Sequence, residues 1–295
     1  MKTVAILGPT GMLGSAVYAQ LKDKYKLILV LRDSDKLPLL YDKYGKCENL
    51  KVVLLDTENI FNDFKKGFHT EHKSETTAKL LEEIGDVDAV INCIGITNRY
   101  SNERPLDAFF INSTLPYLFS WQYGDKFIHI TTDCVFSGIN GAPYDENSLK
   151  SPNDLYGLTK SLGEPSDKSL VLRTSIIGPE ITGYVSLMEW FKKQGHQTIK
   201  GYKTHLWNGI TTREYGNICD RIISNRDKFP KSGLFHIFST DISKYEMLNA
   251  FKEKYQIDVT IEPDEPDPID RRLRTIHNLC KILEIPSFSE MIKEL

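Results

Sequence analysis

The residues of this sequence best suited to chemistry are Tyr156 and Lys160, which stand four positions apart. On a helix, residues at this spacing share a face. A free tyrosine has a pKa of about 10, and a neighbouring ammonium group lowers that pKa because it stabilises the phenolate. We therefore predict that Tyr156 exchanges a proton with a carbonyl oxygen while a hydride reaches the carbonyl carbon. Lys160 is predicted also to hold the ribose of a nicotinamide cofactor. The alternative is a surface Tyr/Lys pair.

Thr132 and Asp133 follow an apolar run, residues 127–131, that has the composition of a strand. Ligands of parallel α/β sheets bind beyond the carboxyl ends of strands. The Thr132 hydroxyl is therefore predicted to hydrogen-bond the substrate carbonyl, which completes a catalytic set with Tyr156 and Lys160. Asp133 is predicted to bind a substrate hydroxyl or to tune Tyr156. The simpler alternatives are a capping hydroxyl at Thr132 and a turn-forming carboxylate at Asp133.

A glycine-rich turn, GPTGMLG at residues 8–14, follows the first apolar run and precedes the first helical pattern. Glycines lack Cβ atoms, so the turn can close tightly and a pyrophosphate can approach the backbone at a helix N-terminus. This context predicts a dinucleotide site. Its residues are Gly8, Thr10, Gly11, Met12, Leu13 and Gly14.

Arg32 ends the second predicted strand, where NAD enzymes usually place a carboxylate for the ribose 2′-hydroxyl. An arginine there suits a 2′-phosphate, although Asp33 follows it directly. NADP is therefore favoured over NAD, and an ordinary surface arginine is the alternative. The small residues after the fourth strand are predicted to let the cofactor ribose lie on the backbone. They are Cys93, Ile94 and Gly95.

Apolar runs alternate with helical patterns through the first half of the chain. Strands are predicted at 3–7, 27–31, 52–55, 89–93, 127–131 and 170–173, and helices at 11–23, 76–84, 105–123 and 154–164. Continuous apolar strands separated by helices are typical of a parallel sheet covered on both faces. The predicted fold is a Rossmann-type doubly wound α/β sheet with a smaller C-terminal α/β substrate-binding region.

The alternation ends near residue 175. We predict a dinucleotide-binding domain over 1–174 and a substrate-binding region over 175–209 and 241–295. Residues 210–240, with a helix near 213–225 and a strand near 234–238, are predicted to return to the first domain. The segment from Glu262 to Asp270 is rich in acid and proline, which predicts an exposed loop.

Composition excludes several classes of protein. The net charge of −3 over 295 residues gives no basic field for nucleic acid, and no apolar run approaches the roughly 18 residues of a membrane span. Five scattered cysteines without a CxxC motif favour a reducing cytoplasm. His69 and His72 stand in polar surroundings without an evident third ligand, so no metal site is predicted.

Five segments together resemble one family. They are GPTGMLG (8–14), TTDCVFSG (131–138), YDENSLKSPNDLYGLTKSLGE (144–164), LRTSIIG (172–178) and WNGITT (207–212). In this order they resemble the dTDP-4-dehydrorhamnose reductases, which are extended short-chain dehydrogenases/reductases. The resemblance implies NAD(P)H-dependent reduction of a 4-keto group on a nucleotide-linked 6-deoxysugar, in cell-surface polysaccharide or nucleotide-sugar biosynthesis. It also implies that Thr132, Tyr156 and Lys160 are catalytic, with Asp133 nearby.

The resemblance implies further cofactor contacts. An acid at the position of Asp56, beside Thr57, meets the adenine amino group in this branch of the superfamily. An asparagine at the position of Asn112 supports the cofactor and water. The alternative for Asn112 is a buried hydrogen-bonding residue inside a helix, where asparagine is disfavoured.

The substrate half carries thinner signals. Extended reductases often place a diphosphate-binding arginine in this region, and the arginine fork can hold two phosphate oxygens. Arg271 and Arg272 are therefore predicted to bind the diphosphate, and the alternative is a solvated basic run. Trp207 is predicted to shape the sugar pocket, and the alternative is a packing role. The predicted substrate residues are Asp133, Val135, Phe136, Trp207, Arg271 and Arg272.

Cys134 departs from the family, which usually has an aromatic residue at this position. Related 4,6-dehydratases carry an acid there, so Cys134 argues against dehydration and leaves the identity of the sugar open. Two other functions remain: an epimerase, which Arg32 and the TTDCVF segment disfavour, and a non-catalytic regulatory subunit that binds NADP and a partner enzyme. The aromatic helix 105–123 is either core or the contact surface of a homodimer.

Overall fold

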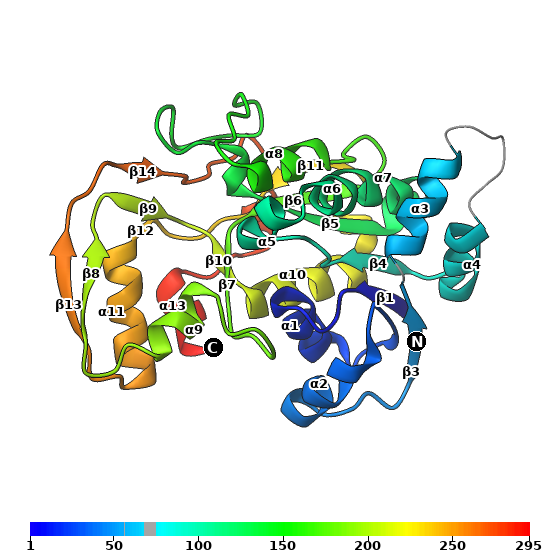
Figure 1. Cartoon of the computed structure of the whole chain (residues 1–295), viewed down its shortest axis with the longest axis horizontal. Helices are drawn as coiled ribbons and strands as arrows, with labels where there is room; N and C mark the ends of the chain where they lie inside the picture. Colours follow the sequence, from blue (N-terminus) through cyan, green and yellow to red (C-terminus); the bar gives the residue numbers. More distant parts are fainter. Residues whose placement is uncertain (56, 68–74) are drawn as a thin grey trace.

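A single parallel sheet forms the centre of the computed structural model, which describes residues 1–55, 57–67 and 75–295 (Figure 1). Its strands are β1 (Thr3–Leu7), β2 (Lys26–Leu31), β3 (Leu50–Leu54), β4 (Ala89–Asn92), β5 (Phe127–Thr132), β6 (Leu170–Thr174) and β11 (Gly233–His236). Their order in space is β11-β6-β5-β4-β1-β2-β3. From β1 the chain adds β2 and β3 on one side, and from β4 it adds the remaining strands on the other side. The boundary between β1 and β4 is where such sheets bind ligands. The predicted Rossmann-type doubly wound fold is confirmed.

Both faces of the sheet are buried because its inner strands are mostly apolar at successive positions, whereas Lys51, Val52 and Leu54 of the edge strand β3 are exposed. In β1, Val4 and Ile6 join one core cluster, whereas Ala5 and Leu7 join the other. The first face is covered by α1 (Met12–Leu21), α2 (Leu37–Tyr44) and α10 (Thr212–Ser224). The second is covered by α3 (Thr57–Gly67), α4 (Glu75–Ile84) and α7 (Leu115–Tyr123).

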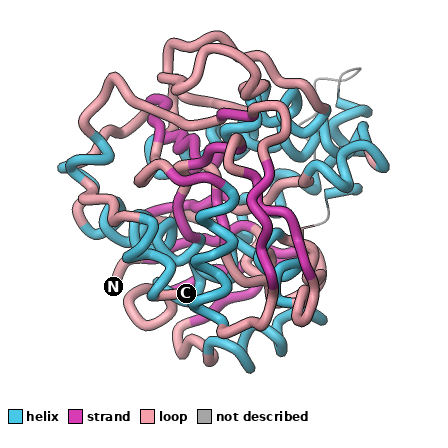
Figure 2. Tube along the Cα trace, turned by 90° about the vertical axis from the view of Figure 1, so that its left-hand side faces the viewer, coloured by secondary structure: helices cyan, strands magenta, loops and turns pink. Residues whose placement is uncertain are grey.

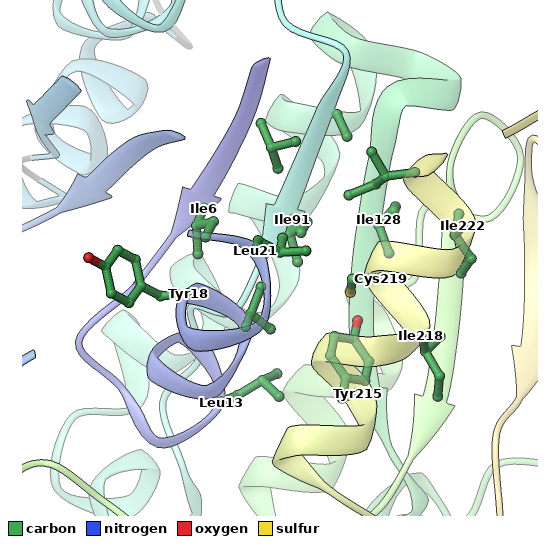
Figure 3. Packing of buried hydrophobic residues seen from close by; sticks show 14 of the residues in the cluster. Ile6, Leu13, Tyr18, Leu21, Ile91, Ile128, Tyr215, Ile218, Cys219 and Ile222 are labelled. Carbon is green, nitrogen blue, oxygen red and sulfur yellow. The ribbon is translucent and has the colours of Figure 1, made fainter. Parts of the chain in front are cut away.

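Helices α1 and α10 lie side by side on the first face, although they are far apart in the sequence (Figure 3). Their apolar side chains, such as Leu21 and Ile218, pack toward Ile91 and Ile128 of the sheet. A Cβ atom at Gly216 would lie 2.7 Å from Cγ of Gln20, so a glycine is what lets the two helices approach. Residues 212–224 and 233–236 thus add a helix and a strand to the sheet of the N-terminal half.

The predicted helix 105–123 is interrupted. It consists of α6 (Pro105–Phe109), a π-helical turn (Phe110–Thr114) and α7. Such π-turns often occur at functional sites, because one extra residue re-aims the side chains of the turn. Helices α5 (Asn98–Glu103) and α8 (Leu155–Leu162) pack against this segment.

A second lobe lies beside the sheet, with its own apolar cluster around Phe191, Met247 and Phe251. Figure 2, which looks from the side of this lobe, shows its long strands in front of the central sheet. Its strands are β7 (Ile176–Ile177), β8 (Thr198–Tyr202), β9 (His205–Trp207), β10 (Ile210–Thr211), β12 (Ile242–Ser243), β13 (Thr260–Asp264) and β14 (Ile269–Asp270). Its helices are α9 (Leu187–Lys192), α11 (Lys244–Tyr255) and α13 (Phe288–Lys293), whereas α12 (Leu279–Ile282) packs on the core of the central sheet beside β11.

The predicted loop from Glu262 to Asp270 is wrong at both ends. Residues up to Asp264 belong to β13, which pairs with β8, and Ile269 begins β14, which pairs with β9. Pro263 is tolerated because β13 pairs on one side only, so the missing N–H leaves no partner unsatisfied. Among the described residues, no helix is long and apolar enough to cross a bilayer.

Candidate active site

Helix α8 is held very close to the end of β5. A Cβ atom at Gly157 would lie 2.2 Å from the carbonyl oxygen of Cys134, and one at Gly163 would lie 1.8 Å from that of Asn112. The helix begins at Asp154, whose carboxylate accepts a hydrogen bond from the Gly157 N–H at 2.7 Å. Gly157 lets the start of α8, with Tyr156, approach the turn that follows β5, and Gly163 lets the end of α8 approach the π-helical turn that carries Asn112.

Burial raises the pKa of Tyr156, with the Cys134 thiol and the Asp133 carboxylate adding to the rise and a hydrogen bond with Thr132 opposing it. The predicted lowering of this pKa by Lys160 is therefore wrong for the protein without ligand. The physical reason is that removal of the phenol from water outweighs any favourable charge. Tyr156 consequently remains a protonated phenol, which is the form that donates a proton.

Lys160 is 4% exposed, and its Nζ donates a hydrogen bond to the carbonyl oxygen of Ile130 in β5 at 2.7 Å. Burial lowers its pKa to about 8, while Glu164 and Cys93 act in the opposite direction. The ammonium group is thus fixed against the strand, beneath the loop that follows β4.

The buried Lys160 predicts a pH-dependent stability. Between about pH 8 and pH 10.5 the unfolded chain binds a proton at Lys160 that the folded chain has lost, so stability rises with pH over this window. We expect the wild type to gain about 3 kcal/mol relative to Lys160→Met across it. Urea denaturation of both proteins at several pH values measures the difference, and parallel curves would contradict the prediction.

Thr132 and Asp133 are buried neighbours in a 3₁₀-helical turn after β5. The Thr132 hydroxyl donates to Asp133 Oδ1 at 3.1 Å and accepts from the Cys134 N–H at 3.2 Å. Burial raises the pKa of Asp133, and Arg271 is the strongest opposing influence. The Thr132 hydroxyl caps this turn and the Asp133 carboxylate takes part in it, as the simpler alternatives from the sequence predicted. Both residues also influence Tyr156, so these contacts do not exclude a role in the site.

The glycine turn has the geometry of an anion cradle. Gly8 has a φ of +76°, which side chains rarely adopt, and a Cβ atom at Gly14 would lie 2.0 Å from the carbonyl oxygen of Gly8. Gly11 differs, because its nearest neighbour would be 3.6 Å away. Helix α1 begins at Gly11 without a side-chain cap, so its first N–H groups face outward. These features fit a pyrophosphate.

The remaining residues of the turn divide into two groups. Leu13 packs into the core, so only its backbone can reach a ligand, whereas Thr10 and Met12 are half-buried. At the end of β2, Arg32 is exposed, but Asp33 Oδ1 caps the next turn by accepting from the Asp35 N–H at 2.8 Å.

Two more cofactor residues were predicted after the third strand. Thr57 is the half-buried first residue of α3. Asp56, like His69 and His72, lies outside the described residues.

The loop after β4 is clamped by Asn112, which the π-turn presents to it. Asn112 Oδ1 accepts from the Ile96 N–H at 2.9 Å, and its Nδ2 donates to the Ile96 carbonyl at 2.9 Å and to Thr159 Oγ1 at 3.0 Å. Cys93 and Ile94 are half-buried and Gly95 is exposed in this loop. Both the oxygen and the nitrogen of the Asn112 amide are hydrogen-bonded within the protein. Asn112 therefore joins the loop after β4 to α8.

A second clamp was not predicted. Asn92 accepts from the Ile94 N–H at 3.0 Å and lies 3.0 Å from Nδ1 of His129, which is buried in β5 near Lys160. Both residues sit inside apolar strands, and a polar residue at such a position is the signal that could have revealed them.

The predicted substrate residues are not all brought together. Arg271 reaches the site: its Nε donates to the Phe136 carbonyl at 3.0 Å, and its Nη1 lies 3.8 Å from the Cys134 sulfur. Arg272 points elsewhere, into ion pairs with Asp270 and Asp241.

Three predicted substrate side chains are occupied by packing. The Trp207 ring packs edge-on against Phe288 at a centroid distance of 5.9 Å. Val135 and Phe136 are fully buried beneath the site, where they form a cluster with Tyr144 and Leu273. A ligand can therefore meet the backbone of residues 135–136 but not their side chains.

The parallel sheet, the glycine turn and the Thr132/Tyr156/Lys160 arrangement define an extended short-chain dehydrogenase/reductase. Within that class, the chain belongs to the family described as RmlD substrate binding domain, whose sequence model matches residues 1–276.

Individual relatives are distant. The spore coat polysaccharide biosynthesis protein SpsK of Bacillus subtilis is 27% identical over 185 residues, which make up 59% of this chain and 63% of that protein. The match thus spans less than two thirds of that relative. Methionine adenosyltransferase 2 subunit beta of Rattus norvegicus is 24% identical over 270 residues, or 87% of this chain and 73% of that protein.

Among solved structures, dTDP-4-dehydrorhamnose reductase from Bacillus anthracis in complex with NADP superimposes with a TM-score of 0.70 at 17% identity. The match covers 100% of this chain and 98% of that chain. At this identity the likeness establishes the shared fold over the whole length.

Proposed function

We propose that the protein reduces the 4-keto group of a nucleotide-linked deoxysugar with NADPH. The observation that carries the proposal is the convergence of Thr132, Tyr156 and Lys160 at the carboxyl end of β5, beside the anion cradle of α1. The bound NADP of the similar reductase and the family match support the class of cofactor and reaction.

In this reaction the chain's residues manage one proton and the orientation of the carbonyl group. NADPH, when bound, supplies the hydride. Tyr156, kept protonated by its burial, donates its proton to the carbonyl oxygen. The Thr132 hydroxyl exchanges its bond with Asp133 for one with the same oxygen, so Asp133 holds that hydroxyl ready. Lys160 remains fixed to β5 and is available to the cofactor ribose.

NADP is the proposed cofactor because Asp33, the carboxylate that could bind a ribose 2′-hydroxyl, already caps a turn of the protein. Asp33 accepts a hydrogen bond from the Asp35 N–H, whereas Arg32 is exposed and unpaired among the described residues. A guanidinium group can bind a 2′-phosphate through two hydrogen bonds and opposite charge, whereas a ribose hydroxyl pair carries no charge for it to neutralise.

Arg32→Glu is expected to weaken NADPH binding by about ten- to hundredfold, the equivalent of about 1.5–3 kcal/mol for a charge-assisted hydrogen bond. NADH binding is expected to stay the same or to tighten, because a carboxylate at this position can accept a hydrogen bond from the ribose 2′-hydroxyl. Lys26→Glu is the matched control, because Lys26 is exposed at the opposite end of the same strand. Fluorescence titration with both cofactors measures the effect, and an equal loss for NADH would show that Arg32 does not read the phosphate.

The function is tested with dTDP-, UDP-, GDP- and CDP-linked 4-keto sugars, each with NADPH and NADH. Net oxidation of NADPH with any of them supports a reductase and identifies the nucleotide. An epimerase would interconvert nucleotide sugars without net consumption of NADPH, and that result would replace the proposal.

A regulatory subunit is the second candidate, because the relative matched over 87% of this chain is a subunit of methionine adenosyltransferase. Such a protein would bind NADP but turn over no keto sugar. The presence of Thr132, Tyr156 and Lys160 together disfavours this role.

Two further proposals concern the setting of the protein. A reducing cytoplasm is supported by five free cysteines. A homodimer through the segment 105–123 is supported by the exposed side chains of Leu106 and Trp121 on α6 and α7.

A further inference from the structure

A fully buried arginine lies behind the active site, and the proposed reaction does not use it. Arg173, in β6, has none of its surface exposed. Its Nε and Nη2 donate to the two carboxylate oxygens of Glu164, at 3.1 and 2.7 Å, and its Nη1 lies 2.9 Å from His236 Nε2. A buried ion pair rarely adds net stability over apolar residues of the same size. Its presence therefore calls for another role.

The first connection runs from Arg173 through His236 to the C-terminal segment. His236 Nδ1 lies 2.8 Å from the carbonyl oxygen of Arg274. A carbonyl oxygen only accepts, so Nδ1 carries the proton, and Nε2 accepts from Arg173. Glu146 continues the connection, because it accepts from the backbone N–H groups of His236 and Ile276, at 2.9 and 3.0 Å.

The second connection runs through Phe136. The Arg173 guanidinium carbon lies 5.2 Å from the centre of the Phe136 ring, which stacks on Tyr144 at 4.2 Å and an interplanar angle of 3°. The backbone of Tyr144 pairs with residues 272–274 by two hydrogen bonds, at 2.9 and 2.7 Å. Arg271 then donates to the carbonyl oxygen of Phe136 at 3.0 Å.

Both connections end on one segment, residues 271–276, which carries Arg271 to within 3.8 Å of the Cys134 sulfur. Their other end is Glu164, two residues after α8. Arg173 thus joins the helix that carries Tyr156 and Lys160 to the segment that carries Arg271.

We propose that Arg173 is a positioning residue for the substrate: acting through Phe136 and His236, it holds segment 271–276 in place over the catalytic helix. The proposal rests on the proposed function for its kinetic readout. Its structural readout, the order of segment 271–276, is independent of any activity.

The test is Arg173→Lys in the full-length protein. Lysine keeps the charge next to Glu164 but has one donor group in place of the planar fork, so it cannot also serve His236 and Phe136. We expect the KM for the keto-sugar nucleotide to rise at least about fivefold, with the KM for NADPH changed by less than about twofold. Hydrogen exchange of the amides of 271–276 is expected to accelerate.

Arg226→Lys is the matched control. Arg226 is also held by several hydrogen bonds, but these run to the carbonyl oxygens of Asp125, Pro230 and Lys231, which lie outside segment 271–276. This variant is expected to lose thermal stability without changing either KM or the exchange of 271–276.

Glu146→Gln provides a second route if Arg173→Lys folds poorly. It keeps the shape of the side chain but removes the carboxylate charge that accepts from the N–H groups of His236 and Ile276, so the same selective rise in KM and faster exchange are expected. Unchanged exchange of 271–276 in a folded variant would overturn the proposal, as would an equal rise in both KM values. If the wild type reduces no keto sugar, the proposed function fails, while the exchange experiment still decides the role of Arg173.

Discussion

Tyr156→Phe is expected to lower kcat for keto-sugar reduction by about 10³-fold, within the range of about 10²–10⁴ for loss of a general acid. The substitution removes only the phenol oxygen. Because burial keeps that phenol protonated, its loss leaves the carbonyl oxygen without the proposed proton donor. Steady-state kinetics with NADPH and the best keto-sugar nucleotide measure the fall.

The same variant is expected to bind NADPH with an affinity within about twofold of the wild type, since the contacts of the glycine turn do not involve Tyr156. Tyr123→Phe is the matched control, because the Tyr123 hydroxyl is buried in α7 and has no hydrogen-bond partner within the part of the chain that the structure describes. Its loss is therefore expected to leave both activity and cofactor binding unchanged. A fully active Tyr156→Phe enzyme would remove Tyr156 from the mechanism.

The strands of the central sheet were predictable from the sequence because each one coincides with a short apolar run. The predicted strand at residues 3–7 matches β1 to the residue, and the predicted strand at 127–131 differs from β5 by one. The same logic failed for β13, where Pro263 and the acids around it indicate a loop. Pairing with β8, some sixty residues earlier, overrides that local preference.

The candidate site shows the same division between local and distant information. The spacing of Tyr156 and Lys160 is local, and so is the succession from β5 to Thr132. The contacts of Arg271 and Arg272 depend on residues far away in the sequence. Arg272 binds Asp241, which lies 31 positions earlier, whereas Arg271 faces Cys134. The interruption of helix 105–123 by a π-turn, which aims Asn112 at Ile96, likewise depends on packing against α8.

The electrostatics of the site followed from burial, which a sequence does not record. Lys160 is an ordinary lysine by its spacing, but its removal from water brings its pKa to about 8. For the same reason the pKa of Tyr156 moves upward and not downward. The direction of each shift could be stated only after the distance of α8 from the end of β5 was known, and that distance depends on Gly157.

Two glycines of the turn at residues 8–14 are expected to respond in opposite ways to alanine. At Gly14 the new methyl group would lie 2.0 Å from the carbonyl oxygen of Gly8, a backbone atom that cannot move without shifting β1 or α1. We expect Gly14→Ala to lower the free energy of unfolding by about 3 kcal/mol, the upper end of the usual cost of overpacking. Denaturation in urea measures this loss.

At Gly11 the methyl group would meet nothing closer than 3.6 Å, and the backbone angles, φ −79° and ψ 170°, are open to any residue. Gly11→Ala is therefore expected to keep its stability within about 1 kcal/mol of the wild type, since the weaker cap and the stiffer unfolded chain offset each other. If a pyrophosphate lies against this backbone, the methyl group takes its place, and NADPH affinity falls at least about tenfold, or about 1.4 kcal/mol. Intact affinity in Gly11→Ala would mean that the cofactor does not approach the turn at this residue. A stable Gly14→Ala would mean that α1 and β1 are not as close as their geometry implies.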